Sequence, residues 1–176
     1  INKNMKEFIS SIEQADSTLG WHFTIPVIKD IAADFMENDR RVICSINGAK
    51  GFHAALMSDG KGDFFINLNK ERRKRLGVAI GEPINITLSK DESKYGMPMP
   101  EEFEELLAID DEGNHFFHAL TPGKQRSLLH LIGKPKSSDV RLKKAIVINE
   151  HLKKNQGKLD FKQLNQDFKD YNQQFK

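Results

Sequence analysis

Residues 64–88 read FFINLNKERRKRLGVAIGEPINITL, and this stretch decides the fold. It begins with a β-rich segment, residues 64–68, which is followed by one short and strongly basic helical turn. We expect Gly77 to end this turn, because helices commonly end at a residue in the left-handed conformation, which glycine adopts without steric penalty. The bases of the turn are Lys70, Arg72, Arg73, Lys74 and Arg75.

A second turn and a second strand complete the same stretch. Gly81-Glu82 forms the turn, and Ile84, Ile86 and Leu88 then alternate with polar residues. Such alternation is typical of a strand with one buried face. Strand, basic turn, second turn and strand therefore form one compact unit.

Short strands separated by turn signals also fill the sequence before this unit. Asn47-Gly48 is the strongest local hairpin signal in the chain. Pro26 suits the first position of a helix, and apolar residues at helical spacing follow it up to Met36. About six strands around one helix are enough to close a small barrel, which removes exposed edges. The expected strands are residues 8–12, 21–25, 42–46, 52–57, 64–68 and 83–88, with a polar turn at 16–20.

The hydrophobic period changes after residue 89. Pro98 and Pro100 favour a linker. Apolar residues at helical spacing follow it, with Asp110 as the cap of a second helix and Thr121-Pro122 at the start of a third.

The predicted fold class is α+β: a small closed β-barrel with one helix at residues 1–90, a linker at 91–100, a helical domain at 101–155 and an amphipathic C-terminal helix at 156–176. We expect this last helix to dock on the helical domain or on another chain, since it carries an apolar stripe of Phe161, Leu164, Phe168, Tyr171 and Phe175.

Composition describes an ordinary globular protein of 176 residues, 38% hydrophobic and 30% charged. No apolar run approaches the roughly 20 residues of a membrane helix, and no charged-then-apolar signal peptide opens the chain, so no membrane span is expected. Cys44, the single cysteine, lies in an apolar strand, where a buried and inert thiol is expected. A reducing, cytoplasmic location fits this cysteine usage best.

The net charge of +2 hides a strong segregation of charge along the chain. Residues 61–75 hold six bases and two acids, residues 90–118 hold two bases and nine acids, and residues 119–176 hold thirteen bases and five acids. Such blocks either hold two domains together, with the acidic segment as partner of the basic turn, or leave a basic face for a polyanion. The commoner explanation of such charge blocks is that they simply form faces exposed to solvent.

Several motifs together resemble a known pair of bacterial domains. The first half resembles a domain of unknown function that is similar to the AbrB/MazE-like, double-split β-barrels. The second half resembles the YdeI/OmpD-associated, bacteriocin-protection domain that often follows it. His53 stands where the first family has Arg. The motifs are Trp21-(x)3-Ile25-Pro26, Asn47-Gly48, Leu56-Met57, Leu68-Asn69-Lys70-(x)2-Arg73-(x)2-Leu76-Gly77-(x)3-Gly81, Phe117-(x)2-Leu120-Thr121-Pro122-(x)3-Arg126 and Ile132-Gly133-Lys134 leading to Arg141.

Three sequence features are compatible with catalytic or ligand-binding chemistry, and each also has a structural explanation. Gly60-Lys61-Gly62 is compatible with a phosphate cradle, but a hairpin turn explains it better. His115 and His118 have a metal-compatible spacing but lack the glutamate of a zincin motif, and two core aromatics lie between them. Cys44 and His53 lie on paired strands, yet a thiol in an apolar strand is usually structural. We therefore predict no catalytic residues, no metal site and no cofactor.

Two functional hypotheses remain. One is a nucleic-acid-binding regulator that contacts DNA phosphates through Arg72, Arg73, Lys74 and Arg75. The other, which the family resemblance implies and which we prefer, is a non-catalytic binding or stress-protection protein. Its partner would be a protein or a small-molecule ligand at the junction of barrel and helices, since domain interfaces favour such sites. The chain is expected to be a monomer or a weak homodimer.

Overall fold

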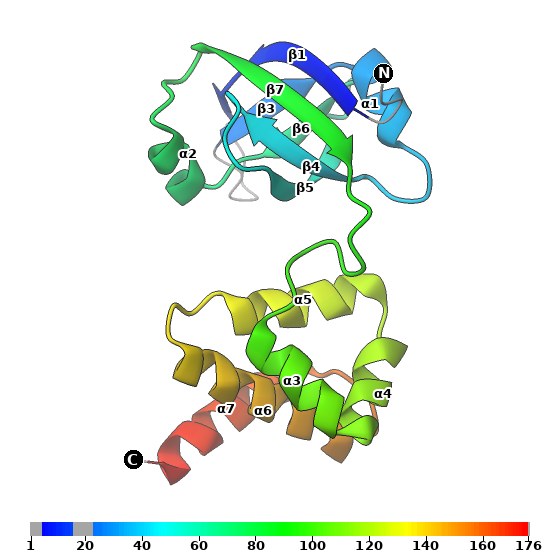
Figure 1. Ribbon diagram of the computed structural model, residues 1–176, viewed down its shortest axis with the longest axis vertical. Helices are drawn as coiled ribbons and strands as arrows, with labels where there is room; N and C mark the ends of the chain where they lie inside the picture. Colours follow the sequence, from blue (N-terminus) through cyan, green and yellow to red (C-terminus); the bar gives the residue numbers. More distant parts are fainter. Residues whose placement is uncertain (1–4, 16–22, 176) are drawn as a thin grey trace. The chain divides into compact units, whose positions relative to one another are not determined.

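The computed structural model describes residues 5–15 and 23–175. The chain divides into two compact units, Ile1–Glu92 and Ser93–Lys176. The first is a small β-barrel with short helices, and the second consists of helices and the loops that connect them (Figure 1). The predicted α+β fold class, a barrel followed by helices, is confirmed.

Seven antiparallel strands form the barrel, in the order β1-β7-β4-β5-β6-β3-β2. The barrel is nearly closed, since Ser10 on β1 donates a hydrogen bond from Oγ to the carbonyl oxygen of Pro26 on β3 at 2.8 Å. The strands are β1 (Met5–Ser11), β2 (Glu13–Gln14), β3 (Phe23–Val27), β4 (Arg41–Ile46), β5 (Phe52–Ser58), β6 (Phe64–Asn67) and β7 (Pro83–Lys90). The helical segments are α1 (Lys29–Ala32), the 3-10 turn η1 (Ala33–Phe35) and α2 (Lys70–Leu76).

The expected hairpin at Asn47-Gly48 is confirmed. Both residues have positive φ, 50° at Asn47 and 73° at Gly48, which is the backbone of a type I′ turn. The amide of Ala49 donates to the carbonyl oxygen of Ile46 at 3.0 Å and closes the turn. The hairpin brings Lys50 and Gly51 back to the start of β5.

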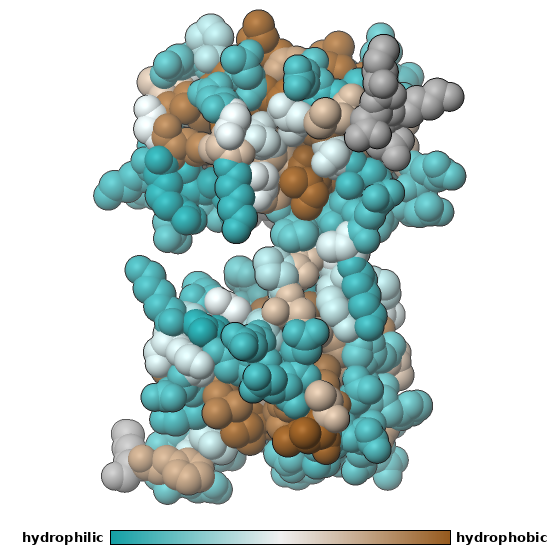
Figure 2. Space-filling model, in the orientation of Figure 1, coloured by the Kyte–Doolittle hydropathy of each residue, from teal (hydrophilic) through white to brown (hydrophobic). Residues whose placement is uncertain are grey.

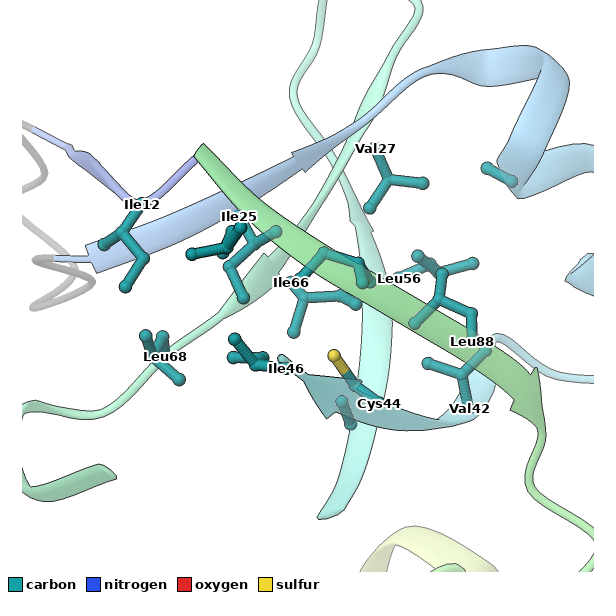
Figure 3. Close-up of a cluster of buried hydrophobic side chains, with 14 of the residues drawn as sticks. Ile12, Ile25, Val27, Val42, Cys44, Ile46, Leu56, Ile66, Leu68 and Leu88 are labelled. Atoms are coloured by element: carbon teal, nitrogen blue, oxygen red, sulfur yellow. The ribbon is translucent and has the colours of Figure 1, made fainter. Parts of the chain in front are cut away.

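Alternation of apolar and polar residues places one face of each strand inside the barrel. Ile84, Ile86 and Leu88 of β7 are each at most 1% exposed, as their alternation predicts. Aliphatic side chains from different strands converge in the core (Figure 3), and the sulfur of Cys44 lies among them. The predicted buried thiol is therefore confirmed.

The prediction of a helix starting at Pro26 is wrong. Pro26 lies in β3 opposite Phe65, and the helix that follows is only the short α1 and η1. The physical reason is that Phe23, Ile25 and Val27 alternate inward, and their burial holds the strand through the proline. The strand β2 was not expected, whereas the polar turn at 16–20 and Trp21 lie outside the described residues.

Five helices form the second unit, and their buried side chains share one core. Asp110 caps α4 as predicted, since its Oδ1 accepts a hydrogen bond from the amide of Gly113 at 2.9 Å. Three residues of the C-terminal stripe dock on this unit: Leu164 is 1% exposed, and Phe168 and Tyr171 pack against the core. The other two, Phe161 and Phe175, are exposed. The helices are α3 (Glu101–Ile109), α4 (Asp111–Ala119), α5 (Pro122–Gly133), α6 (Ser138–Lys154) and α7 (Phe161–Gln174).

Among the described residues, the structure contains no helix with the length and apolar character needed to span a membrane.

Candidate functional site

The basic turn predicted from the sequence is the helix α2, which a side-chain cap begins and a left-handed glycine ends. Asn69 precedes it and accepts a hydrogen bond from the amide of Arg72 to its Oδ1 at 2.7 Å. Gly77 follows it with φ of 65° in the left-handed region, which confirms its predicted role as terminator. Hydrophilic side chains crowd the surface over α2 (Figure 2).

The four consecutive bases of α2 do not share one environment. Arg72 lies over the ring of Phe52, with Cζ 3.8 Å from the ring centroid. Arg73 lies over the ring of Phe23 at 4.2 Å. Both arginines are half-buried, whereas Lys74 and Arg75 are exposed. Because a guanidinium over an aromatic ring is held by cation–π attraction, two of the four bases pack on the barrel.

A pocket of about 380 Å³ opens between α2 and the hairpin of β4 and β5. Its charged side chains are Lys50, Arg72 and Arg75, and no acid is among its lining residues. None of the three bases forms an ion pair with another described residue. The remaining lining residues are Ile46, Ala49, Gly51, Phe52 and Leu76. We call this site, lined by these eight residues, the cationic pocket.

The electrostatics of the cationic pocket favour an anion. Burial, and secondarily the neighbouring charge of Arg75, lower the pKa of Arg72 from its ordinary value. The two arginines therefore repel each other, and the neighbouring carboxylate of Glu71 acts on the pKa of Arg72 in the opposite direction. An anion bound between Lys50, Arg72 and Arg75 would relieve this repulsion and accept charge-assisted hydrogen bonds from arginine and lysine.

The Gly60-Lys61-Gly62 turn does not present a free phosphate cradle. Two of its amides already have acceptors within the turn. Oδ1 of Asp59 accepts from the amide of Lys61 at 2.7 Å, and also from that of Asp63, which follows the turn, at 3.1 Å. The amide of Gly60 donates to Oγ of Ser58 at 3.3 Å. The structure therefore supports the hairpin-turn interpretation.

The histidine pair of α4 also has a structural explanation. His118 uses both ring nitrogens: Nδ1 bonds the carbonyl oxygen of Asn114 at 2.9 Å, and Nε2 bonds the hydroxyl of Tyr95 at 2.7 Å. The ring of His115 lies against Phe116. In the part of the chain that the structure describes, no group of three histidine, cysteine or carboxylate residues has metal-binding geometry.

Cys44 and His53 are not a nucleophile–base pair. In the register of β4 and β5, Cys44 pairs with Phe52 and Ile43 pairs with His53. Because neighbouring residues on a strand point to opposite faces, the thiol faces the core and the imidazole faces outward. Burial raises the pKa of Cys44 to about 12. His53 instead bonds the buried carboxylate of Asp91 through Nδ1 at 2.7 Å.

Sequence analysis missed Lys50 and the aromatic partners of the arginines as components of a site. The missed signal is the hairpin itself: a turn at Asn47-Gly48 returns Lys50 and Phe52 along β4, toward the segment that follows β6. Only the order of strands in the barrel shows that α2 lies beside this hairpin. The sequence pattern alone predicts the run of basic residues, but the pocket depends on the three-dimensional order of the strands.

In the helical unit, the most connected polar side chains stabilise the fold. Glu102 on α3 and Arg141 on α6 form a forked pair, with Nε of Arg141 3.0 and 3.1 Å from the two carboxylate oxygens. Arg141 also donates to the carbonyl oxygens of Pro135 and Lys136. This arginine, which the sequence motif singled out, therefore fixes the junction of α5 and α6.

Two family models match the chain. Residues 8–88 match the Domain of unknown function (DUF1905), and residues 97–155 match the family described as Bacteriocin-protection, YdeI or OmpD-Associated. No curated protein and no solved structure matches. The resemblance to the two families is confirmed, whereas the relation to AbrB/MazE-like barrels in particular stays a prediction. The helix α7 lies outside both matches.

Proposed function

Because the chain carries a DUF1905 domain followed by a YdeI/OmpD-associated domain, we propose that it is a non-catalytic binding protein with a protective role of the bacteriocin-protection kind. The binding step is capture of an anion at the cationic pocket. The observation that supports this most directly is the meeting of Lys50, Arg72 and Arg75 around one pocket whose lining contains no acid. The proposal includes a cytoplasmic location, in keeping with one reduced cysteine.

The pocket is built for binding more clearly than for reaction. Arginine binds phosphate or carboxylate oxygens as a permanently charged donor, and the ammonium group of lysine binds them as a donor of hydrogen bonds. The single thiol of the chain, Cys44, is buried in the barrel core, outside the lining of the pocket, and burial raises its pKa to about 12. A bound anion would therefore be held rather than attacked.

Inorganic phosphate is the simplest probe of this proposal. We would titrate it into isotope-labelled full-length protein and follow amide shifts, expecting saturable changes at residues 46–52 and 72–76. Arg75→Gln and Lys50→Gln should each raise the Kd about tenfold, since each removes one charge-assisted hydrogen bond. Lys74→Gln removes the same charge from the same helix but lies outside the lining, so it is the matched control.

Two results would overturn the proposal. One is the absence of saturable shifts in the unmodified protein. The other is an equal loss of affinity in Arg75→Gln and Lys74→Gln, which would indicate a diffuse charge effect and no defined pocket.

The alternative is a nucleic-acid-binding regulator, and the exposure of Lys74 and Arg75 is the observation that favours it. Replacing Arg72, Arg73, Lys74 and Arg75 together by alanine would be a poor test, because it also removes the contacts on Phe52 and Phe23. Lys74→Gln combined with Arg75→Gln leaves those contacts intact. A DNA-binding protein should lose duplex affinity and salt dependence in this variant.

We expect the unmodified protein to show no tight duplex binding at about 0.15 M salt. Sequence-selective retardation of duplex DNA at that salt, lost in the Lys74→Gln/Arg75→Gln variant, would promote the alternative.

A further inference from the structure

The lining of the cationic pocket is only partly charged. Ala49, Phe52 and Leu76 contribute apolar surface beside the three bases, whereas Ile46 is only 1% exposed. An inorganic anion would contact the bases and leave this apolar surface in water. Burying it against a ligand is favourable in proportion to the area removed from water. The pocket therefore matches a molecule that joins an anionic group to an apolar body.

The contact between Phe52 and Arg72 indicates which shape of apolar group the ligand should have. The guanidinium of Arg72 lies over the ring of Phe52, with Cζ 3.8 Å from the ring centroid, and both residues line the pocket. Arginine planes and aromatic rings are surfaces on which further planar groups stack. A planar apolar group would use this surface better than a branched aliphatic one.

We propose that the ligand of the cationic pocket is an aromatic anion, an aryl phosphate or aryl carboxylate, with its ring against Phe52, Leu76 and Arg72. The anionic group of this ligand lies with Lys50 and Arg75. This inference rests on the proposed function and specifies its ligand class. The volume of about 380 Å³ falls within the roughly 300–1,000 Å³ of small-molecule sites and suits a compact aryl compound.

Phenyl phosphate and methyl phosphate test the inference, because they share the anionic group and differ in the ring. Titrated into the full-length protein, phenyl phosphate should bind at least about tenfold more tightly than methyl phosphate. Intermolecular nuclear Overhauser effects should join the phenyl protons to the methyl groups of Ala49 and Leu76. Benzoate and acetate repeat the comparison with a carboxylate in place of the phosphate group.

A pair of variants separates the apolar contact from general effects. Leu76→Ala should bring the ratio between the Kd of methyl phosphate and the Kd of phenyl phosphate closer to one, because it removes an apolar contact that only the phenyl ring makes. Ile80→Ala removes an exposed apolar side chain that does not line the pocket, so it should change neither the Kd of phenyl phosphate nor that of methyl phosphate. Melting curves of both variants establish that they are folded.

The outcomes distinguish this inference from the proposed function. Equal, saturable binding of phenyl and methyl phosphate at the pocket would overturn the aromatic ligand and leave anion capture standing. If phenyl phosphate, methyl phosphate and inorganic phosphate all failed to bind, the aromatic ligand and the proposed function would both be overturned. Should Leu76→Ala fail to fold, the nuclear Overhauser effects in the unmodified protein decide, and contacts mapping away from residues 46–52 and 72–76 would contradict the inference.

Discussion

Asn149 on α6 fills the space that a side chain at Gly113 on α4 would need. Its Oδ1, Cγ and Nδ2 atoms all lie too close to the position of a Cβ at Gly113 for normal packing. Nδ2 of Asn149 also donates to Oδ2 of Asp110 at 2.8 Å, and Asp110 caps α4. The two helices therefore approach closely because residue 113 has no side chain, and a polar network fixes the contact.

Gly113→Ala should destabilise the helical unit by about 1–3 kcal/mol, because the methyl group displaces Asn149 from a packed site. Gly123→Ala is the matched control, since a Cβ there meets no atom within 4 Å. Alanine is the better helix former, so this control should be neutral or slightly stabilising. Thermal unfolding followed by circular dichroism measures both variants, and equal melting temperatures would show that Asn149 moves aside at no cost.

Gly77→Val should destabilise the barrel unit by more than about 1 kcal/mol, because a β-branched residue is strained in the left-handed region. A Cβ at this position meets no atom within 4 Å, so any loss comes from the backbone conformation and not from a clash. Gly77→Asn should be milder, since asparagine tolerates this conformation. Equal denaturant midpoints for Val, Asn and wild type would show that the φ of 65° is not required.

How far the sequence predicts this fold depends on how local each feature is. The Asn47-Gly48 turn, the Gly77 terminator, the Asp110 cap and the alternation of β7 are all read from a few neighbouring residues, and the structure confirms them. Pro26 was misjudged because its local preference for a helix start conflicted with strand pairing to β6 that only the barrel supplies.

The candidate site was less accessible to sequence reasoning for the same reason. The basic run of α2 stands out in one dimension, but residues far apart in the sequence decide its environment. Phe23 and Phe52 cover Arg73 and Arg72, and Lys50 completes the pocket across a separation of 22 or more residues from the arginines. No local pattern marks such pairs, and only strand order brings them together.

Removal of α7 should destabilise the helical unit. Truncation after Gly157 exposes the surface that Leu164, Phe168 and Tyr171 cover. It also deprives the fully buried His151 of Asp167, 2.7 Å from its Nδ1, and of the Asp160 amide, which donates to its Nε2. A large drop in melting temperature is expected, because burying apolar side chains contributes about 25 cal/mol per Å².

The matched control for this truncation is a shorter one after Gln174, which removes Phe175, a residue 68% exposed. This variant should melt close to wild type. If the longer truncation melted at the same temperature and had the same molar mass in solution, the packing of α7 would contribute nothing to stability.

Acid should unfold the helical unit through its two best-paired carboxylates. The amide of Gly113, then Lys153 and Asn149, lower the pKa of Asp110 to about 2. Hydrogen bonds from Arg141 and Ser138 lower the pKa of Glu102 to about 2. Because both pKa values are lower in the folded state, the ionised carboxylates stabilise the fold above about pH 4. This stabilisation is lost as the pH falls from about 4 toward 2.

Asp110→Asn tests this linkage, since asparagine is also a good helix cap but carries no charge to lose. The variant should be less stable than wild type at pH 7, and the difference should shrink toward zero near pH 2, because wild-type Asp110 is then also becoming neutral. Glu105→Gln removes one exposed carboxylate of α3 that forms no ion pair with a described residue, so its difference from wild type should be small at both pH values. Urea unfolding followed by circular dichroism, repeated across this pH range, gives the free energies. A difference between wild type and Asp110→Asn that stayed constant from pH 7 to pH 2 would show that Asp110 acts through its shape as a cap and not through its charge.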